Sequence, residues 1–210
     1  CRTDFTGPGI VVVLDRCGAS STVDAYDLAS GNLRTWPAGL DARRLEPAGC
    51  AVGRSGCTGL AGPGGGWLIG PDGGLATAHG LTPGSWLLGR TALRAEDSRI
   101  LAHDAETGAL KWSWPIVAGG PADVRIVAVE PGRVHLLTPY HDLYTLDTGD
   151  GTQLSRFRAH IIGDNKPWMP GHVYASHGYV CIERLLPGGT ADRVDSAYYY
   201  PFPTLLLTGS

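Results

Sequence analysis

The sequence lacks the features by which nucleic-acid-binding and membrane-spanning proteins are recognised. Its formal net charge is −3, with 17 lysines and arginines against 20 aspartates and glutamates, so it offers no basic surface to nucleic acid. No apolar run approaches the roughly 18 residues that predict a membrane-spanning helix. No stretch has the periodicity of a long amphipathic helix either. These absences argue against a nucleic-acid partner and an internal membrane span, and 210 residues are enough for one domain with a full core.

Catalytic and metal-binding patterns are equally scarce. No serine is flanked as Gly-x-Ser-x-Gly, so no nucleophile elbow is predicted. Four small groups of acidic, histidine and cysteine side chains remain as candidates. They are Glu96 with Asp97, Asp147 with Asp150, His135 with His141, and His172 and His177 with Cys181. Because each group lies in or across a predicted turn, we interpret its members as turn and strand residues rather than as acid–base pairs or metal ligands.

Glycine and proline are abundant, with 31 and 15 residues, as expected for an all-β protein rich in tight turns. The clearest example is the stretch 99–114. Strand-like alternation runs up to Asp104, whose carboxylate can accept N–H bonds from the next residues in an Asx-type turn. Gly108 supplies a positive φ, and the alternation resumes through Trp112 and Trp114. This stretch predicts a β-hairpin with one apolar face, which needs neighbouring strands to bury it.

The same Asp-x-x-x-Gly turn occurs three times, each time between two strand-like segments. The copies are Asp27 to Gly31, Asp104 to Gly108 and Asp147 to Gly151. Asp104 and Asp147 are 43 residues apart, and Asp27 precedes Asp104 by 77 residues, which is nearly two such steps. A period of roughly 40 residues with four short strands per unit is typical of a β-propeller blade.

These copies resemble the repeat of the quinoprotein-type (PQQ-like) β-propeller family, whose blades carry a motif close to Leu-Tyr-Ala-Leu-Asp-Ala-x-Thr-Gly-x-x-x-Trp. The matching segments are 101–108 followed by Trp112, 25–31 followed by Trp36, and, more loosely, 144–151 followed by Phe157. A fourth, eroded copy at 172–182 keeps its first hairpin but lacks the turn. The resemblance implies that Trp36, Trp112 and Trp114 pack between blades.

The resemblance also implies the fold: an all-β, small β-propeller of PQQ-like repeats with four or five blades in a single domain, 1–210. The expected blades are 9–37, 65–80 in degenerate form, 85–116, 124–160 and 172–208. The first blade lacks one strand in this interpretation, and the segment 204–208 is a strand without a partner. We therefore expect the C-terminal strand to pair with the first blade and close the ring, which would remove two exposed edges.

The family resemblance does not extend to the quinone. Quinoproteins with these repeats bind it on the axis of a considerably longer ring, beside a calcium site with acidic and asparagine ligands and often a pair of adjacent cysteines. In this sequence no two cysteines are adjacent, and Asn32 and Asn165 are the only asparagines. We therefore expect no PQQ and no other cofactor or metal.

The five cysteines favour an oxidising compartment. Cys50 and Cys57 bracket a glycine-rich loop and are predicted to form a disulfide, worth roughly 2–3 kcal/mol on chain-entropy grounds. The alternative is a pair of free or metal-binding thiols. Cys1 is either the lipidated first residue of a mature bacterial lipoprotein or a fragment boundary, bonded in that case to Cys17. Both interpretations place the protein outside the cytoplasm, and the first anchors it to the outer face of the cytoplasmic membrane.

Loops at a propeller face are where partners bind, and the predicted loops carry several aromatic residues. We expect a face with Tyr140, His141 and an exposed Trp168 to contact a protein or a glycan. The expected function is a non-catalytic binding or scaffold module that is extracytoplasmic, anchored to the membrane at its N-terminus, and engaged with a protein partner there. Two alternatives remain: an enzyme of the hydrolase or lyase type with a site in an axial funnel, and the sensor ectodomain of a membrane receptor.

Overall fold

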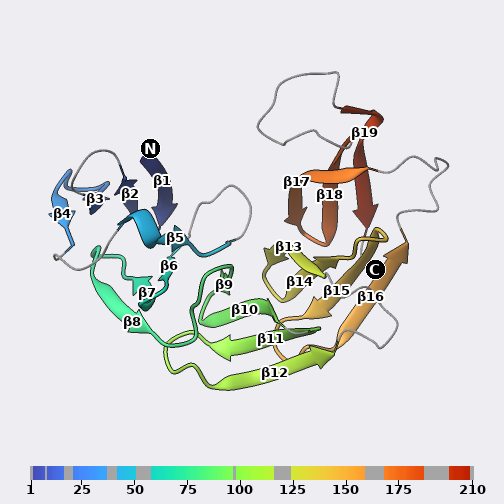
Figure 1. Cartoon of the computed structure of the whole chain (residues 1–210), viewed down its shortest axis with the longest axis horizontal. Coiled ribbons are helices and arrows are strands. Elements are labelled where there is room, and N and C mark those ends of the chain that lie inside the picture. The colour runs from blue at the N-terminus through green and yellow to red at the C-terminus, as the bar shows by residue number, and fades with distance from the viewer. Residues whose placement is uncertain are drawn as a thin grey trace. The chain divides into compact units, whose positions relative to one another are not determined.

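The computed structural model describes residues 2–7, 9–16, 21–36, 42–50, 58–96, 98–115, 124–158, 168–186 and 199–208. Most of them lie in β-strands and the turns between strands, which confirms the all-β prediction (Figure 1). The chain divides into two compact units, Cys1–Pro115 and Ile116–Ser210. That it forms a single domain stays a prediction. None of the helical structure in the described ranges has the length and apolar character of a membrane span.

The first unit contains three antiparallel sheets of four strands, and each sheet uses consecutive strands of the chain. The first sheet consists of β1 (Arg2–Gly7), β2 (Ile10–Asp15), β3 (Thr22–Asp27) and β4 (Leu33–Thr35). After the 3₁₀ helix η1 (Ala42–Arg44), the second consists of β5 (Glu46–Pro47), β6 (Gly59–Gly62), β7 (Gly65–Ile69) and β8 (Leu75–Ala78). The third consists of β9 (Trp86–Leu88), β10 (Thr91–Glu96), β11 (Arg99–Asp104) and β12 (Leu110–Pro115).

The second unit contains two antiparallel sheets. The fourth sheet of the chain consists of β13 (Arg125–Glu130), β14 (Arg133–Leu137), β15 (Asp142–Asp147) and β16 (Gln153–Arg158). The fifth consists of β17 (Met169–Ser176), β18 (Tyr179–Leu185) and β19 (Tyr199–Thr208). All five sheets therefore have the antiparallel, sequential strand order of propeller blades.

The strands at the two chain ends belong to the sheets nearest to them in sequence. The C-terminal strand β19 pairs with β18 in the fifth sheet, so it is not without a partner, and its expected pairing with the first blade stays a prediction. The first sheet obtains its fourth strand from β1, which pairs with β2 from Arg2↔Asp15 to Gly7↔Ile10. Closure of a ring stays a prediction.

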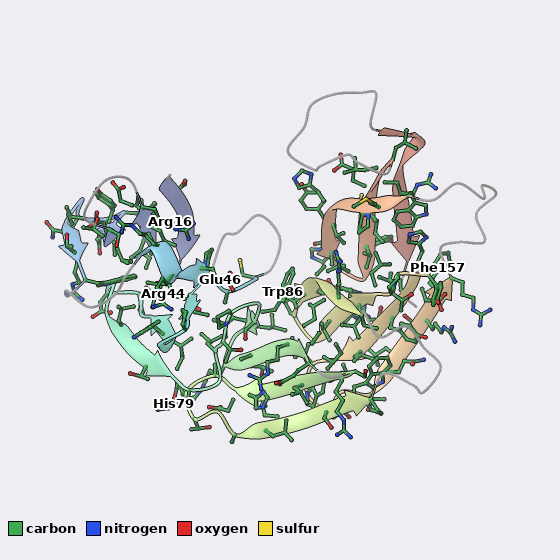
Figure 2. The ribbon with its side chains drawn as sticks, viewed as in Figure 1. Arg16, Arg44, Glu46, His79, Trp86 and Phe157 are labelled. Atoms are coloured by element: carbon green, nitrogen blue, oxygen red, sulfur yellow. The ribbon has the colours of Figure 1, made fainter. Side chains whose placement is uncertain are left out.

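The second sheet is complete although its blade was expected only in degenerate form. The strand β6 reads Gly-Leu-Ala-Gly, a poor strand sequence by propensity, yet all four residues are buried. Small residues are needed because neighbours approach closely: a Cβ at Gly59 would lie 3.0 Å from a methyl carbon of Leu87. Nearby, Trp86 of β9 (Figure 2) covers Gly49 so closely that a Cβ there would lie 2.5 Å from the indole. Close packing therefore selects these residues.

Each Asp-x-x-x-Gly turn forms as predicted, at the end of the third strand of its sheet. Asp104 Oδ1 accepts the N–H of Thr107 at 2.9 Å, and these hydrogen bonds hold the pKa of Asp104 below its ordinary value. Gly108, with φ of 75°, donates its N–H to the Asp104 carbonyl at 2.9 Å. The turns at Asp27 and Asp147 repeat this arrangement.

The residue that follows each aspartate fastens the turn to the first hairpin of the same sheet. The backbone bonds are Leu28 N–H to Gly9 O at 2.9 Å, Ala105 N–H to Arg90 O at 2.8 Å, and Thr148 N–H to Gly132 O at 3.1 Å. Each bond therefore extends the ladder between the second and third strands of its sheet by one residue, beyond the pair that contains the aspartate.

The turns also align the first, third and fourth sheets residue by residue. The aspartates pair with Ile10, Thr91 and Arg133 on the adjacent strands. Two residues into the sheet from each pair, the facing side chains are Val12 with Ala25, Leu93 with Ala102, and His135 with Thr145. All six are buried, so an apolar pair forms the centre of two sheets and a polar pair forms the centre of the third.

The motif tryptophan at position 36 packs between two sheets, as the resemblance implied. Its indole is buried in the core of the first unit, and Nε1 donates a hydrogen bond of 2.8 Å to the carbonyl of Gly73 in the β7–β8 turn. Trp112 is also buried, whereas Trp114 is half-buried. The Trp36 side chain thus joins the first sheet to the second by a hydrogen bond as well as by the packing of its ring.

Candidate functional site

The three residues expected on a binding face lie in or beside the turn between β14 and β15. Tyr140, in that turn, is 68% exposed. Trp168, which directly precedes β17, is only 6% exposed and belongs to a hydrophobic core cluster of the second unit. The expectation that Trp168 is exposed is therefore wrong. His141 is half-buried and contacts Trp168. Whether this face binds a partner stays a prediction.

His141 is fixed in an unusual conformation. Its φ is 62°, in the left-handed region that residues other than glycine rarely adopt. The imidazole stacks on the Trp168 indole, with ring centroids 3.8 Å apart and planes inclined by 15°. Nε2 lies 3.0 Å from the Trp168 carbonyl oxygen, and because a carbonyl only accepts, Nε2 carries the hydrogen. These contacts, with the backbone bond from His141 N–H to Thr138 O at 2.9 Å, hold the strained turn in place.

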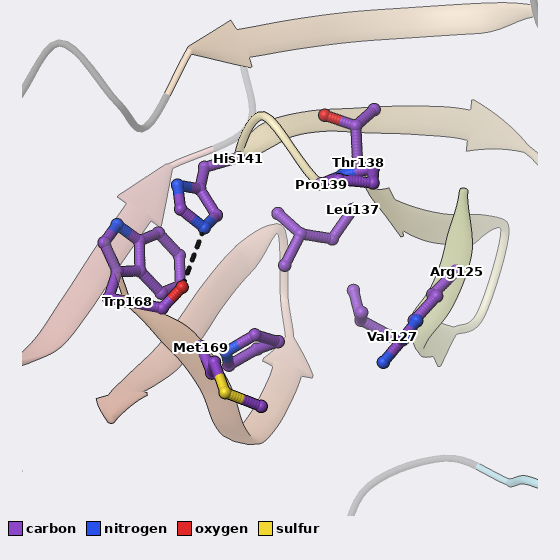
Figure 3. Close-up of a pocket in the computed structure, with 9 residues that line it drawn as sticks. Arg125, Val127, Leu137, Thr138, Pro139, His141, Trp168 and Met169 are labelled. Atoms are coloured by element: carbon purple, nitrogen blue, oxygen red, sulfur yellow. Dashed lines mark hydrogen bonds between the residues drawn. The ribbon is translucent and has the colours of Figure 1, made fainter. Parts of the chain in front are cut away.

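A pocket of about 280 Å³ opens beside this stack (Figure 3). One wall is formed by Arg125 and Val127 of β13, and the opposite wall by Trp168 and Met169. Leu137, at the end of β14, contributes an apolar surface between them. Sequence reasoning missed this pocket because its walls come from three segments of the chain that meet only in the folded sheet.

A β-bulge lies in one wall of the pocket. In the β13–β14 ladder, Ile126 pairs with Leu136 and Ala128 pairs with His135, so Val127 is an extra residue without a partner in that ladder. Arg125 and Val127 are two residues apart on β13, so strand alternation places both side chains on one face, and both line the pocket. No sequence signal marks the bulge.

A second cluster lies in the interior of the second unit: the sequence indicated His135 as a candidate but not its partners Glu130 and Thr145. His135 Nδ1 lies 3.1 Å from Thr145 Oγ1, and His135 Nε2 lies 3.2 Å from Glu130 Oε1. The other carboxylate oxygen of Glu130 accepts the N–H of Gly178, in the β17–β18 turn, at 3.3 Å. Burial lowers the pKa of His135 below its ordinary value of 6.5, although contact with Glu130 opposes this shift.

This cluster has the connectivity of a hydroxyl–imidazole–carboxylate triad, but its surroundings do not suit catalysis. The three residues are at most 5% exposed, and none of them lines the pocket. A nucleophile must reach a reacting atom of its substrate. The arrangement instead joins the fourth sheet to the hairpin of the fifth, through the bond between Glu130 and Gly178.

Three other candidates from the sequence, His172, His177 and Asp150, have local partners, and Asp97 lies outside the described residues. His172 Nδ1 lies 2.9 Å from Glu183 Oε2, and His177 Nδ1 lies 2.7 Å from Ser176 Oγ. Asp150 accepts the N–H of Thr152 at 2.8 Å. Within the described ranges, no group of three or more histidine, cysteine, aspartate or glutamate side chains is placed to hold a metal ion.

The cysteine predictions rest largely on residues outside the described part of the chain. Cys50 is disulfide-bonded, but Cys57, Cys1 and Cys17 lie outside the described residues. The Cys50–Cys57 pairing and the lipidation of Cys1 therefore stay predictions. Cys181 is a free thiol in β18.

Comparison with solved structures identifies the fold. BamB from Moraxella catarrhalis superposes with a TM-score of 0.51 at 14% identity, over 87% of this chain and 58% of that one. The computationally designed Ika8 protein superposes with a TM-score of 0.50 at 16% identity, over 87% of this chain and 54% of that one. A quinohemoprotein alcohol dehydrogenase from Comamonas testosteroni also matches, with a TM-score of 0.36 at 17% identity, over 88% of this chain and 29% of that one.

The chain shares the fold of PQQ-like β-propeller proteins. The resemblance seen in the three turn motifs is thereby confirmed at the level of the fold. This chain spans a little over half the length of BamB and of Ika8. No family model matches the sequence, and no curated protein matches it either.

Proposed function

We propose that this protein is a non-catalytic binding module that engages a protein partner through the β14–β15 turn and the adjacent pocket. The observation that carries the proposal is the pairing of an exposed aromatic with a rigid support. Tyr140 offers its ring to solvent, while the next residue, His141, is locked against Trp168 by stacking and a hydrogen bond. Exposed aromatics on rigid turns contribute strongly to binding because little conformational freedom is lost on contact.

The proposal includes a location outside the cytoplasm and an N-terminal membrane anchor at Cys1. Its support is the cysteine content of the sequence and the disulfide at Cys50, because disulfides persist mainly in oxidising compartments. The test is the intact mass of the protein isolated from its native membrane, before and after reduction. A lipid adduct on Cys1 is expected, and an unmodified Cys1 would refute the anchor.

The binding function is tested by site-specific crosslinking in the native host. A photoreactive phenylalanine analogue is placed at position 140 of the full chain, and in a matched control at position 154, where Leu154 is also exposed on β16. A discrete adduct with one protein is expected at position 140 and not at position 154. No adduct at position 140, or the same adducts at both positions, would overturn the proposed function.

A further inference from the structure

The pocket beside His141 carries one formal positive charge in an apolar setting. Val127, Leu137, Trp168 and Met169 provide apolar surface, and none of the lining residues is acidic. Arg125 is exposed and has no hydrogen bond or ion pair with any other described residue. Its side chain extends along Val127, across the pocket from Trp168 and Met169 (Figure 3). The pocket therefore combines an apolar surface with an unpaired guanidinium.

The size of the pocket limits what it can hold. Its volume of about 280 Å³ lies just below the usual range for drug-sized ligands, roughly 300–1,000 Å³. It suits one large residue rather than a long segment. Within one residue, an apolar side chain and a carboxylate occur together only at the C-terminus of a chain. An internal acidic residue would need a second residue to supply the apolar group.

We propose that the pocket binds the C-terminal residue of a partner protein, with its apolar side chain against Leu137 and Met169 and its carboxylate on Arg125. The planar guanidinium can donate two parallel N–H bonds to a carboxylate. This inference rests on the proposed function, because it assumes that the partner is a protein. It adds the chemistry of the contact: an apolar final residue with a free carboxylate.

The walls of the pocket are already ordered without the ligand. The stack of His141 on Trp168 fixes one side, and the bulge at Val127 is part of a paired β-ladder. Binding therefore does not need to order a loop, which lowers its entropic cost. A single terminal residue still makes few contacts, so we expect a weak interaction on its own, with a Kd on the order of 1 mM.

The test uses short peptides as probes and the full chain as the receptor. Acetyl-Gly-Gly-Leu with a free carboxylate is titrated into ¹⁵N-labelled protein and followed by NMR shifts. Two further probes are the same peptide as its C-terminal amide and acetyl-Leu-Asp-amide, which carries an internal acid. Binding of the free acid is expected, with at least about fivefold weaker association for both other peptides, as the loss of a partly exposed charged hydrogen bond predicts.

Two arginine variants locate the contact. Arg125→Gln should weaken binding of the free acid about five- to tenfold and abolish its preference over the amide. Arg158→Gln removes an exposed arginine at the end of β16 and should leave the affinity unchanged. Equal binding of acid and amide, no binding of either, or equal effects of the two variants would overturn the inference.

Crosslinking at position 140 separates this inference from the proposed function. If the adduct forms in the host and Arg125→Gln leaves its yield unchanged, the proposed function stands and the C-terminal contact is refuted. If Arg125→Gln reduces the adduct severalfold while Arg158→Gln does not, both are supported. If no adduct forms although the free peptide binds, the protein-binding function is refuted and the inference built on it fails with it.

Discussion

The third and fourth sheets have the same register and the same turn, but the facing pair at the centre is apolar in the third and polar in the fourth. In the third sheet the facing pair is Leu93 and Ala102, and in the fourth it is His135 and Thr145. All four side chains are buried. The apolar pair needs only neighbours of suitable shape, whereas the polar pair needs a hydrogen-bond partner for each ring nitrogen, and Glu130 completes that set. The repeat therefore fixes the backbone of a sheet but not whether the facing pair at its centre is apolar or polar.

The polar centre of the fourth sheet, formed by Glu130, His135 and Thr145, is also bonded to the fifth sheet. In the third sheet, Leu88 occupies the position of Glu130, because each pairs with the residue that aligns with the motif aspartate. Leu88 can only pack, but Glu130 accepts a bond from Gly178 in the next hairpin. Buried hydrogen bonds are directional. We therefore expect the bond from Gly178 to Glu130 to restrict the position of the fifth sheet against the fourth more tightly than an apolar contact would.

Placing the polar residue in the apolar sheet should have the largest effect. The variant Leu93→His removes a fully buried leucine and inserts an imidazole that neither Ala102 nor Leu88 can satisfy with a side-chain acceptor. We expect a loss of about 3–5 kcal/mol in the free energy of unfolding, measured by urea denaturation at neutral pH. Leu93→Met, which conserves volume, should cost less than about 1.5 kcal/mol. Similar costs for both variants would contradict the comparison.

Breaking the polar centre at one point should cost somewhat less. Glu130→Ala leaves His135 Nε2 and the Gly178 N–H without their acceptor, and we expect a loss of about 2–3 kcal/mol. The triple variant Glu130→Leu, His135→Leu, Thr145→Ala recreates the centre of the third sheet. It should be more stable than Glu130→Ala in the same urea experiment, because only the Gly178 N–H loses its acceptor, whereas Glu130→Ala also leaves His135 Nε2 unpaired. A triple variant less stable than the single one would show that the two centres are not interchangeable.

The pH dependence of stability should also distinguish the two centres. Burial lowers the pKa of His135 in the folded protein below the value near 6.5 of the unfolded chain, so the unfolded state binds more protons as the pH falls. The stability that the neutral His135 side chain contributes is therefore fully present above about pH 6.5. It is lost below that pH, as the pH falls towards the lower pKa of His135 in the folded protein. The triple variant should lose less stability than the natural protein between pH 7.5 and 5. Parallel curves would indicate that His135 does not titrate as described.

Alanine substitutions of the turn glycines should destabilise the first and third sheets to a similar extent, and the difference between them should be the smallest of those that we predict. Gly31 and Gly108 have φ values of 72° and 75°, so alanine at either position should cost about 1–2 kcal/mol through backbone strain. A Cβ at Gly31 meets no atom within 4 Å, but at Gly108 it would lie 3.2 Å from the Cβ of His79. Gly108→Ala should therefore be slightly more destabilising in thermal melts. A larger loss for Gly31→Ala would contradict this reasoning.

The predictable part of the fold is local in sequence. The three turns were found because Asp104 and its equivalents bond to residues two or three positions away, and such spacing is visible in a sequence. The strand β6 was missed because its glycines are required by the close approach of residues distant in sequence, such as Leu87 to Gly59. The strand β1 was missed because its sequence does not alternate between apolar and polar residues.

The candidate site was predicted only in part, for a related reason. Tyr140 and His141 were found because they lie in a turn, but the burial of Trp168 depends on a core assembled from β13 to β18. Arg125 was not found, since the pocket that it lines forms only where β13 meets the distant residues Trp168 and Met169. Long-range contacts and irregular register leave no mark on the periodicity that sequence reasoning uses.

The sequential order of strands within each sheet has a consequence for how such a chain evolves. No described sheet takes a strand from outside its own continuous stretch. In the first, third and fourth sheets the turn is held by backbone bonds that span only 15 to 19 residues, such as Ala105 to Arg90 and Leu28 to Gly9. One gene segment thus encodes one complete sheet. Duplication or deletion of such a segment would change the number of sheets while each remaining strand keeps its neighbours in its own sheet, so repeats can multiply first and diverge at their centres afterwards.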